Sequence, residues 1–159
     1  MRTRASRAGS FDVPRPLRVA ARRREREDVW TLDLAPEGDV GRGAPGQFNM
    51  LYAHGAGEAP ISLSGDPRQG ALRHTIRAVG GVTRALCETA VGDRVGVRGP
   101  FGKGWPLSEA CGRDLWLVAG GIGLAPLRPV VQAALASPRR FGRVRLIYGA
   151  RAPPSLLFP

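Results

Sequence analysis

A cluster of glycines between an apolar run and a helix-like stretch is the part of this sequence best suited to bind a ligand. The cluster comprises Gly120, Gly121, Ile122 and Gly123, and Pro126 follows it. Glycine lets backbone N–H groups approach a ligand closely, and the start of a following helix attracts an anion. The spacing therefore favours a seat for the diphosphate of a nucleotide. An ordinary strand-to-helix turn is the alternative, because the dinucleotide fingerprint has a third glycine that this sequence lacks.

The cysteines and histidines are not spaced for metal binding or for acid–base chemistry. Cys87 and Cys111 form no C-x-x-C pair, and single cysteines of this kind are typical of small buried apolar side chains. His54 and His74 are far apart in the sequence and have no ligand spacing. We therefore predict no metal site and no catalysis by a pair of side chains.

The elements around the glycine cluster predict an α/β unit. Residues 114–119 form a continuous apolar strand, residues 125–136 have the apolar face of a helix, and residues 144–148 form a second strand. Strand, helix and strand in this order make one right-handed crossover of a parallel sheet. The ligand would then lie at the carboxyl ends of the two strands, where parallel sheets collect their ligands.

Short alternating strands fill the sequence before this unit. They are expected at residues 17–21, 29–34, 48–52, 60–64, 74–79 and 94–98, with turn signals between them. A helix is expected at residues 83–89, with Thr83 as its N-cap because a threonine hydroxyl can accept a backbone N–H. Regularly spaced short strands of this kind predict an antiparallel barrel or sandwich.

Composition sets limits on size and location. Hydrophobic residues make up 43% of the 159 residues, which is enough for a buried core. No apolar stretch approaches the roughly 20 residues needed to span a bilayer, and the arginine-rich N-terminus lacks the apolar segment of a secretory signal. We expect a cytoplasmic chain with no membrane span.

The net charge of +11 is typical of proteins that bind nucleic acid, but its distribution argues against that function. Nine arginines fall within residues 1–26, and Lys103 is the only lysine, which is typical of a coding bias. The tract at residues 22–26 is expected to be a solvated, partly stranded face. The ten aromatic residues are scattered, so the sequence shows no series of stacking platforms for bases.

Five motifs in order along the chain together resemble the ferredoxin–NADP reductase superfamily. They are residues 45–48, 60–64, 80–83, 92–102 and 121–126. Within the superfamily the chain looks most like the flavin-bearing gamma subunit of cytosolic nickel–iron hydrogenases. The electron-transfer subunits of anaerobic sulfite reductase and dihydroorotate dehydrogenase are similar. The resemblance covers residues 14–151.

The resemblance implies a fold of the β plus α/β class. A six-stranded antiparallel β-barrel would hold FAD, and an incomplete parallel α/β lobe would bind a nicotinamide nucleotide. The implied organisation is a disordered basic N-terminus at residues 1–11, an FAD-binding barrel at residues 12–110 and a partial NAD(P)-binding domain at residues 111–159.

The flavin motif of the family falls on one predicted strand. Its candidate cofactor-binding residues are Pro60, Ile61, Ser62 and Leu63. By resemblance, Ser62 donates its hydroxyl toward the reactive edge of the flavin ring and is the candidate catalytic residue, because a small donor does not block the ring. Ile61 would lie against the ring face. Taken alone, Ser62 is equally well explained as a strand serine with satisfied hydrogen bonds.

A second flavin motif implies a seat for the FAD diphosphate at the start of a short helix. It comprises Gly80, Gly81, Val82 and Thr83. Backbone N–H groups and the Thr83 hydroxyl would be the donors. Ala59 stands where the family has an arginine that pairs with this diphosphate. Either Arg77 on the next strand supplies the charge, or flavin binding is weakened.

In the α/β lobe the resemblance assigns the glycine cluster and Pro126 to the nicotinamide nucleotide. Arg151, just after the second strand, would meet the adenosine side of this ligand, although a solvent-exposed arginine explains it equally well. No acidic residue follows to bind a ribose 2′-hydroxyl, so NAD and NADP remain alternatives.

The chain stops at Pro159, whereas members of the family continue for several more strands. We therefore expect a truncated chain that transfers hydride poorly and leaves apolar surface exposed on its parallel sheet. Full-length relatives are also expected to carry a [2Fe–2S] centre. Its cysteine cluster is absent here, and neither Cys87 nor Cys111 replaces it.

The sequence thus predicts a flavin-dependent oxidoreductase subunit that passes electrons between NAD(P)H and a redox partner. The partner would be a hydrogenase or another iron–sulfur subunit. A non-catalytic remnant that only contacts partner subunits is the alternative, supported by Ala59 and the early end. A basic barrel that binds nucleic acid is a third, less favoured function.

Overall fold

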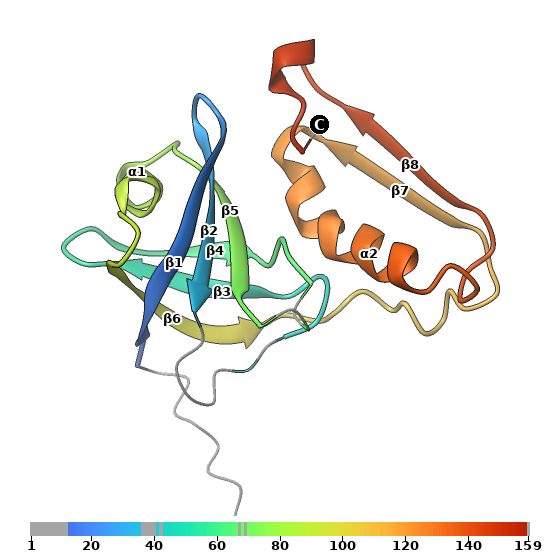
Figure 1. Cartoon of the computed structure of the whole chain (residues 1–159), viewed down its shortest axis with the longest axis horizontal. Coiled ribbons are helices and arrows are strands. Elements are labelled where there is room, and N and C mark those ends of the chain that lie inside the picture. The colour runs from blue at the N-terminus through green and yellow to red at the C-terminus, as the bar shows by residue number, and fades with distance from the viewer. Residues whose placement is uncertain (1–12, 36–40, 42, 67, 69, 159) are drawn as a thin grey trace, which may run out of the picture.

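The computed structural model describes residues 13–35, 41, 43–66, 68 and 70–158. Figure 1 shows two lobes side by side, a β lobe formed by the first part of the chain and an α/β lobe formed by the last part. The predicted disorder of residues 1–11 lies outside the described residues.

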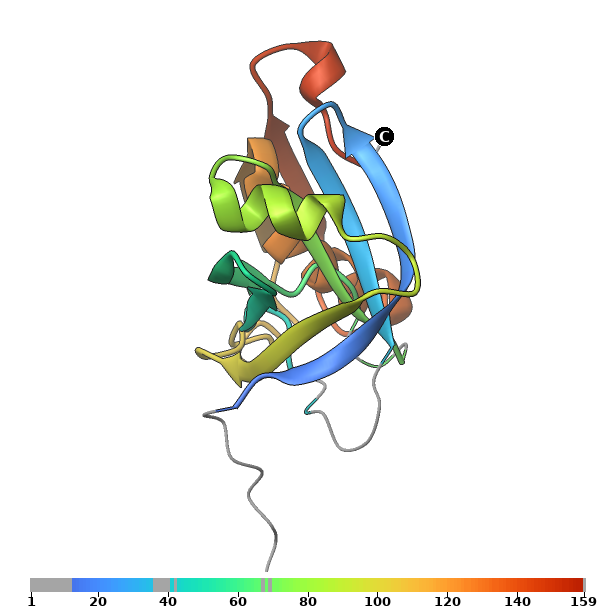
Figure 2. The ribbon, with the colours of Figure 1, turned by 90° about the vertical axis from the view of Figure 1, so that its left-hand side faces the viewer.

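Six strands form the sheet of the β lobe. They are β1 (Arg15–Arg26), β2 (Val29–Ala35), β3 (Phe48–Ala53), β4 (Gly57–Ser62), β5 (Leu72–Arg77) and β6 (Arg94–Phe101). Their order is β4-β3-β6-β1-β2-β5, and neighbouring strands are antiparallel. The outer strands meet where Leu63 and His74 form a bridge and Ser64 N donates to Arg73 O at 2.9 Å. The sheet therefore curls into the predicted barrel (Figure 2).

Alternation along the strands builds the barrel core. Leu17 and Val19 of β1 and Leu32 and Leu34 of β2 point inward and are at most 1% exposed. Successive side chains of a strand point to opposite faces, so these alternating apolar residues all reach one interior. Leu51 of β3 completes this set at 0% exposure.

Helix α1 (Gly81–Glu88) packs on this core through Leu86. The prediction that Thr83 is its N-cap is wrong, because the N-cap is Gly80 in an extended conformation. Thr83 lies in the first turn, where its hydroxyl oxygen accepts the N–H groups of Val79 at 3.0 Å and Gly80 at 2.9 Å. The Thr83 hydroxyl therefore still stabilises the start of the helix, by binding N–H groups of residues that precede it.

The arginine tract forms the last part of β1, which runs to Arg26. Arg22 lies with its guanidinium 3.5 Å from the centre of the Trp30 ring, and its Nε donates to Cys87 O at 2.9 Å. Arg23 pairs with Glu25 at 2.8 Å. The tract is stranded, as expected, but these two side chains are engaged with the barrel rather than simply solvated.

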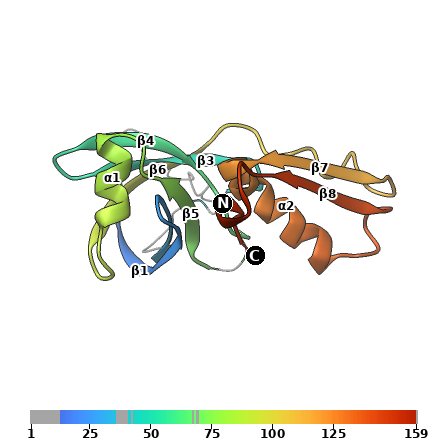
Figure 3. The same ribbon diagram turned by 90° about the horizontal axis from the view of Figure 1, so that it is seen from above.

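The α/β lobe contains β7 (Leu115–Gly120), the 3₁₀ turn η2 (Gly121–Gly123), α2 (Leu124–Ala136), β8 (Val144–Gly149) and the 3₁₀ turn η3 (Pro153–Ser155). Strands β7 and β8 are parallel, with Leu117 opposite Leu146. Helix α2 covers one face of this pair (Figure 3), and Val130 and Ala134 of the helix are buried. The predicted β plus α/β fold is therefore confirmed.

The other face of the parallel pair is open. Trp116 is 57% exposed, Val118 68% and Ile147 52%, so the expected exposed apolar surface is present. No helix in the described part of the chain is long and apolar enough to cross a membrane. The predicted domain boundary after residue 110 falls between the end of β6 and the start of β7.

Candidate functional site

A cleft of about 750 Å³ lies where the barrel meets the α/β lobe. Its lining residues come from both lobes and are Asp28, Arg77, Gly120, Gly121, Ile122, Gly149, Ala150, Arg151 and Ser155. The cleft brings together five residues that the sequence nominated for cofactor binding, although they are separated by up to 74 positions: Arg77, Gly120, Gly121, Ile122 and Arg151.

The glycine turn presents bare backbone to this cleft. Gly121 has φ of +52°, in the left-handed region that glycine enters without strain. A Cβ added at Gly120 or Gly121 would meet nothing within 4 Å, whereas one added at Gly99 in the barrel would lie 2.5 Å from Asn49 Oδ1. The turn is therefore open for an approaching ligand atom, while Gly99 is a packing glycine.

The start of α2 adds a favourable potential for an anion. Its N-cap, Gly123, supplies no capping side chain, and its first turn contains no acidic residue. The N–H of Leu124 already donates to Gly121 O and Ile122 O, so the attraction for negative charge at this helix start comes from the helix dipole. Pro126, which lies in this first turn, has no N–H of its own to offer.

Tyr148 holds the glycine turn in place. Its hydroxyl donates to Gly121 O at 3.0 Å and accepts the N–H of Leu157 at 3.2 Å. A single side chain at the end of β8 therefore connects the turn after β7 with the C-terminal segment. This connection fixes the backbone that faces the cleft.

The cation on the barrel side of the cleft is Arg77, at the end of β5. Its Nε lies 3.2 Å from Asp28 Oδ2, and the two side chains are 35% and 53% exposed. The same Nε is buried and makes no hydrogen bond to any described residue. The pair is thus a charge contact without a directed hydrogen bond.

The first flavin motif lies at the end of β4, on a support of buried polar groups. His74, fully buried, donates through Nδ1 to Ser62 O at 3.1 Å, and its Nε2 accepts from Asn49 Nδ2 at 3.2 Å. A carbonyl oxygen can only accept, so Nδ1 carries the proton. Burial lowers the pKa of His74 to about 4, which keeps the ring neutral at physiological pH. The backbone of Ser62 is therefore held from inside the barrel.

The other members of that motif differ in their accessibility. Pro60 is exposed and Ile61 is half-buried, so both remain at the surface with Ser62. Leu63 is 1% exposed in the barrel core, and its N–H donates to Gln47 O at 3.0 Å. Its side chain therefore packs inward and offers no surface to a flavin.

The second flavin motif lies at the start of α1, outside the cleft. Gly80 and Gly81 are exposed, and a Cβ added at either would meet nothing within 4 Å. Val82 packs partly against the barrel core. Since the Thr83 hydroxyl is already engaged with Val79 and Gly80, the free donors here are backbone N–H groups of the first turn.

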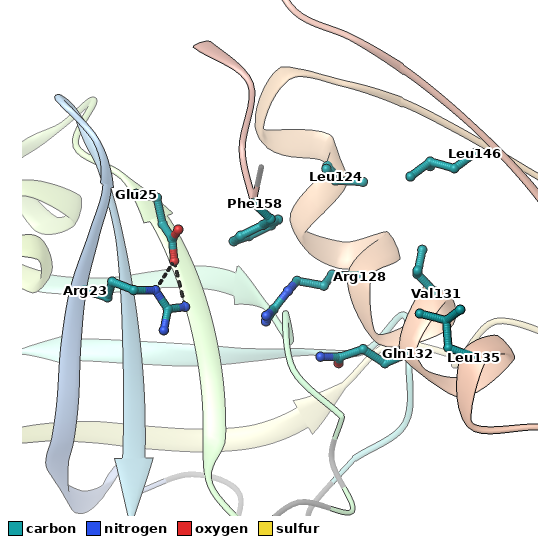
Figure 4. A pocket seen from close by; sticks show the side chains of 9 residues that line it. All are labelled: Arg23, Glu25, Leu124, Arg128, Val131, Gln132, Leu135, Leu146 and Phe158. Carbon is teal, nitrogen blue, oxygen red and sulfur yellow. Dashed lines mark hydrogen bonds and ion pairs between the residues drawn. The ribbon is translucent and has the colours of Figure 1, made fainter. Parts of the chain in front are cut away.

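A second groove, of about 540 Å³, runs between β1 and α2. Figure 4 shows Arg128 extending from α2 toward the barrel, next to Phe158 and facing Arg23. Arg128 donates to Ser64 O at 3.1 Å and stacks on the Phe158 ring at 4.7 Å, and Arg23 is paired with Glu25. These contacts tie Arg128 and Arg23 to the protein, whereas Oε1 of Gln132, which also lines the groove, is buried and makes no hydrogen bond to any described residue.

Four lining residues of the cleft were not among the predicted cofactor-binding residues: Asp28, Gly149, Ala150 and Ser155. Gly149 is the last residue of β8 and Ala150 follows it directly before Arg151, so their position at the strand end was a usable signal. No sequence signal pointed to Asp28. It reaches the cleft only through the pairing of β2 with β5, which places Val29 opposite Arg77.

Comparisons with known proteins agree with this architecture. Residues 117–159 match the family described as "Oxidoreductase NAD-binding domain". The chain is 40% identical to sulfhydrogenase 2 subunit gamma of Pyrococcus furiosus over 114 residues, which are 72% of this chain and 39% of that protein. It is 38% identical over 151 residues to the probable dihydroorotate dehydrogenase B (NAD(+)) electron transfer subunit of Methanothermobacter thermautotrophicus, covering 94% of this chain and 53% of that one. The chain thus spans about half or less of these relatives.

Solved structures confirm the fold. The cytochrome P450 reductase GcoB from Amycolatopsis superposes with a TM-score of 0.78 at 28% identity, over 92% of this chain and 45% of that chain. Phthalate dioxygenase reductase gives a TM-score of 0.79 at 23% identity, over 91% and 46% respectively. The predicted resemblance to ferredoxin–NADP reductase-like proteins, with hydrogenase gamma and dihydroorotate dehydrogenase electron-transfer subunits as relatives, is confirmed.

Proposed function

We propose that this ferredoxin–NADP reductase-like chain, with its oxidoreductase NAD-binding lobe, binds FAD on the barrel and a nicotinamide dinucleotide in the cleft. In this proposal it passes electrons between NAD(P)H and a redox partner in the cytoplasm, such as a hydrogenase or another iron–sulfur subunit. The observation that carries the proposal is the cleft itself, where an open glycine turn faces two arginines from different lobes. Bare backbone N–H groups and positive charge together favour the binding of an anionic dinucleotide.

The residues present fit FAD at the surface strand of the barrel. Ser62, on a backbone held by buried His74, would donate its hydroxyl to the ring edge, and Ile61 would cover the ring with apolar surface. The open N–H groups at the start of α1 would receive the diphosphate. When bound, FAD supplies the exchange of a two-electron hydride for single electrons.

The cleft residues have a different task, which is to position the nicotinamide dinucleotide. The glycine turn would contact its diphosphate through backbone N–H groups, and Arg151 would lie toward its adenosine side. Tyr148 keeps the turn in the shape that receives the ligand. None of these residues needs to exchange a proton, which agrees with the lack of an acid–base pair in the sequence.

The first test is a visible absorption spectrum after reconstitution with FAD, followed by anaerobic addition of NADH or NADPH. A flavin spectrum that bleaches supports both halves of the proposal. A flavin spectrum that does not bleach supports FAD binding and contradicts electron transfer from the nicotinamide nucleotide to the bound flavin. A colourless protein that cannot be reconstituted overturns the flavin assignment.

Two glycine variants separate the two sites. Gly120 and Gly80 both have extended backbone that valine adopts, and at both positions a Cβ would enter open space. Gly120→Val should weaken NADH or NADPH binding by about tenfold or more and leave FAD binding unchanged, because a side chain would fill the cleft. Gly80→Val should have the opposite pattern. Equal effects of both variants on both ligands in calorimetric titrations would contradict the two-site assignment.

A further inference from the structure

The acidic residue of the cleft lies in a place that should oppose an anionic ligand. Asp28 is in the two-residue turn between β1 and β2, since Arg26 pairs with Val29 across that turn. Its carbonyl accepts the N–H of Ala78 at 2.8 Å, which fixes the turn against the end of β5. The hairpin thereby brings a carboxylate to the side of the cleft opposite the glycine turn.

The carboxylate has only one cationic contact within 4 Å among the described residues, and that contact is incomplete. Arg77 Nε is 3.2 Å from Asp28 Oδ2 but forms no hydrogen bond to a described residue. Other arginine pairs of the barrel are fully formed: Arg98 Nε, for example, donates to Glu58 Oε2 at 2.9 Å. A phosphate oxygen offers an arginine a shorter, directed and charge-assisted hydrogen bond, so a diphosphate is a better partner for Arg77 than Asp28 is.

We propose that Asp28 is a competitor built into the cleft: it holds Arg77 when no ligand is present, and a diphosphate must take Arg77 from it. This inference rests on the proposed function, because the ligand is one of its dinucleotides. Asp28 thus lowers the affinity for the diphosphate group and makes Arg77 a positioning residue whose orientation depends on the ligand. Both side chains are partly exposed, so the effect is moderate.

The diphosphate has two sources, FAD and the nicotinamide dinucleotide, and the chemistry at Arg77 is the same for both. Arg77 was nominated for FAD in the sequence, yet it lines the cleft together with the nucleotide turn. Separate titrations with FAD and with NADH identify the source. Inorganic pyrophosphate carries the same anionic group without nucleosides, so a third titration reports on the anion alone.

The test is the dissociation constant of each probe for the full chain and for Asp28→Asn, measured by calorimetry. Asn keeps the shape of the side chain and removes its charge, so binding of pyrophosphate and of one dinucleotide should tighten by about three- to tenfold. Glu27→Gln is the matched control, because it removes the same charge from the same turn at a residue that does not line the cleft. Its dissociation constants should stay within about twofold of the unmodified chain.

The Arg77→Gln background shows whether Asp28 acts through Arg77. In that background Asp28→Asn should tighten binding of the probes by less than about twofold, because the arginine for which Asp28 and the ligand compete is absent. An undiminished gain would show direct repulsion of the ligand and overturn the competition. Unchanged or weaker binding in Asp28→Asn alone would also overturn it.

If the full chain binds pyrophosphate with the expected response to Asp28→Asn but binds neither dinucleotide, the proposed function fails while the competition stands. Binding of no probe overturns both.

Discussion

The barrel and the α/β lobe bury their apolar side chains to very different degrees. Leu32 and Leu51 in the barrel are 0% exposed, whereas Leu146 of β8 is 45% exposed and Trp116 of β7 is 57% exposed. A closed sheet has one interior, which its own strands and α1 fill. A two-stranded parallel sheet has two faces, and a single helix covers only part of one.

This difference separates two ways of holding a site. In the barrel the candidate flavin strand rests on a packed core and on the buried pair His74 and Asn49. In the α/β lobe the side chain that supports the glycine turn is Tyr148, whose hydroxyl joins the Leu124 N–H in binding Gly121 O. We infer that perturbations of the barrel act on global stability, while perturbations of the lobe act locally, on the shape of the cleft.

The largest expected effect comes from the barrel core. Leu32→Ala should lower the free energy of unfolding by about 2–5 kcal/mol, because the cavity it leaves is closed on all sides. Leu135→Ala on α2 removes the same atoms from a side chain that is 73% exposed, and it should change stability by less than about 0.5 kcal/mol. Urea unfolding of both variants measures the contrast, and similar losses would remove the distinction between the lobes.

A fall in pH should lower the stability of the barrel through His74. Its pKa falls from 6.5 to about 4 on burial, so between these pH values the unfolded chain takes up a proton that the folded chain refuses. The stability contributed by the neutral ring is therefore complete above pH 6.5 and is lost as the pH falls toward 4. The loss amounts to about 3 kcal/mol, since one pKa unit corresponds to about 1.4 kcal/mol.

Unfolding free energies at pH 7.5 and pH 4.5 test this, together with an NMR titration of the imidazole signals. His74 should keep the shifts of a neutral ring down to pH 5. His54→Gln, a change at an exposed histidine, should retain the same loss of stability with acid. An imidazole signal of His74 that titrates near pH 6.5 in the folded protein would contradict the argument.

Alternation and turn signals were sufficient to predict the six barrel strands and the crossover unit, because these patterns are local in sequence. The extent of β1 was underestimated. Its arginine tract has no apolar alternation, and it remains in the strand because Arg22 packs on Trp30 and bonds to Cys87. The start of α1 was also misassigned, because the sequence pattern did not show that the Thr83 hydroxyl accepts the N–H of Gly80, the residue that is the N-cap.

Only the part of the candidate site that lies in recognisable sequence motifs was predicted. The glycine turn and Arg151 each follow a strand end, so parallel pairing brings them to one edge of the sheet. Arg77 and Asp28 reach the same cleft because the barrel packs against the α/β lobe. The hydrogen bond from Arg128 to Ser64 O is one contact that holds the two lobes together. Contacts of this kind leave no local pattern in the sequence.

The smallest expected effect belongs to the hydroxyl that supports the cleft. Tyr148→Phe removes two hydrogen bonds, to Gly121 O and from Leu157 N, each worth about 1 kcal/mol. The Leu157 amide should exchange with solvent several-fold faster, and NADH should bind about three- to tenfold more weakly. Tyr52→Phe, which removes the same atom from the barrel strand β3, is the matched control and should leave NADH binding unchanged. Because both hydrogen bonds lie in the α/β lobe, their loss should open that lobe locally and leave the free energy of unfolding of the barrel within about 0.5 kcal/mol of the unmodified chain. A loss of global stability without a change in NADH affinity would show that the hydroxyl supports the fold rather than the cleft.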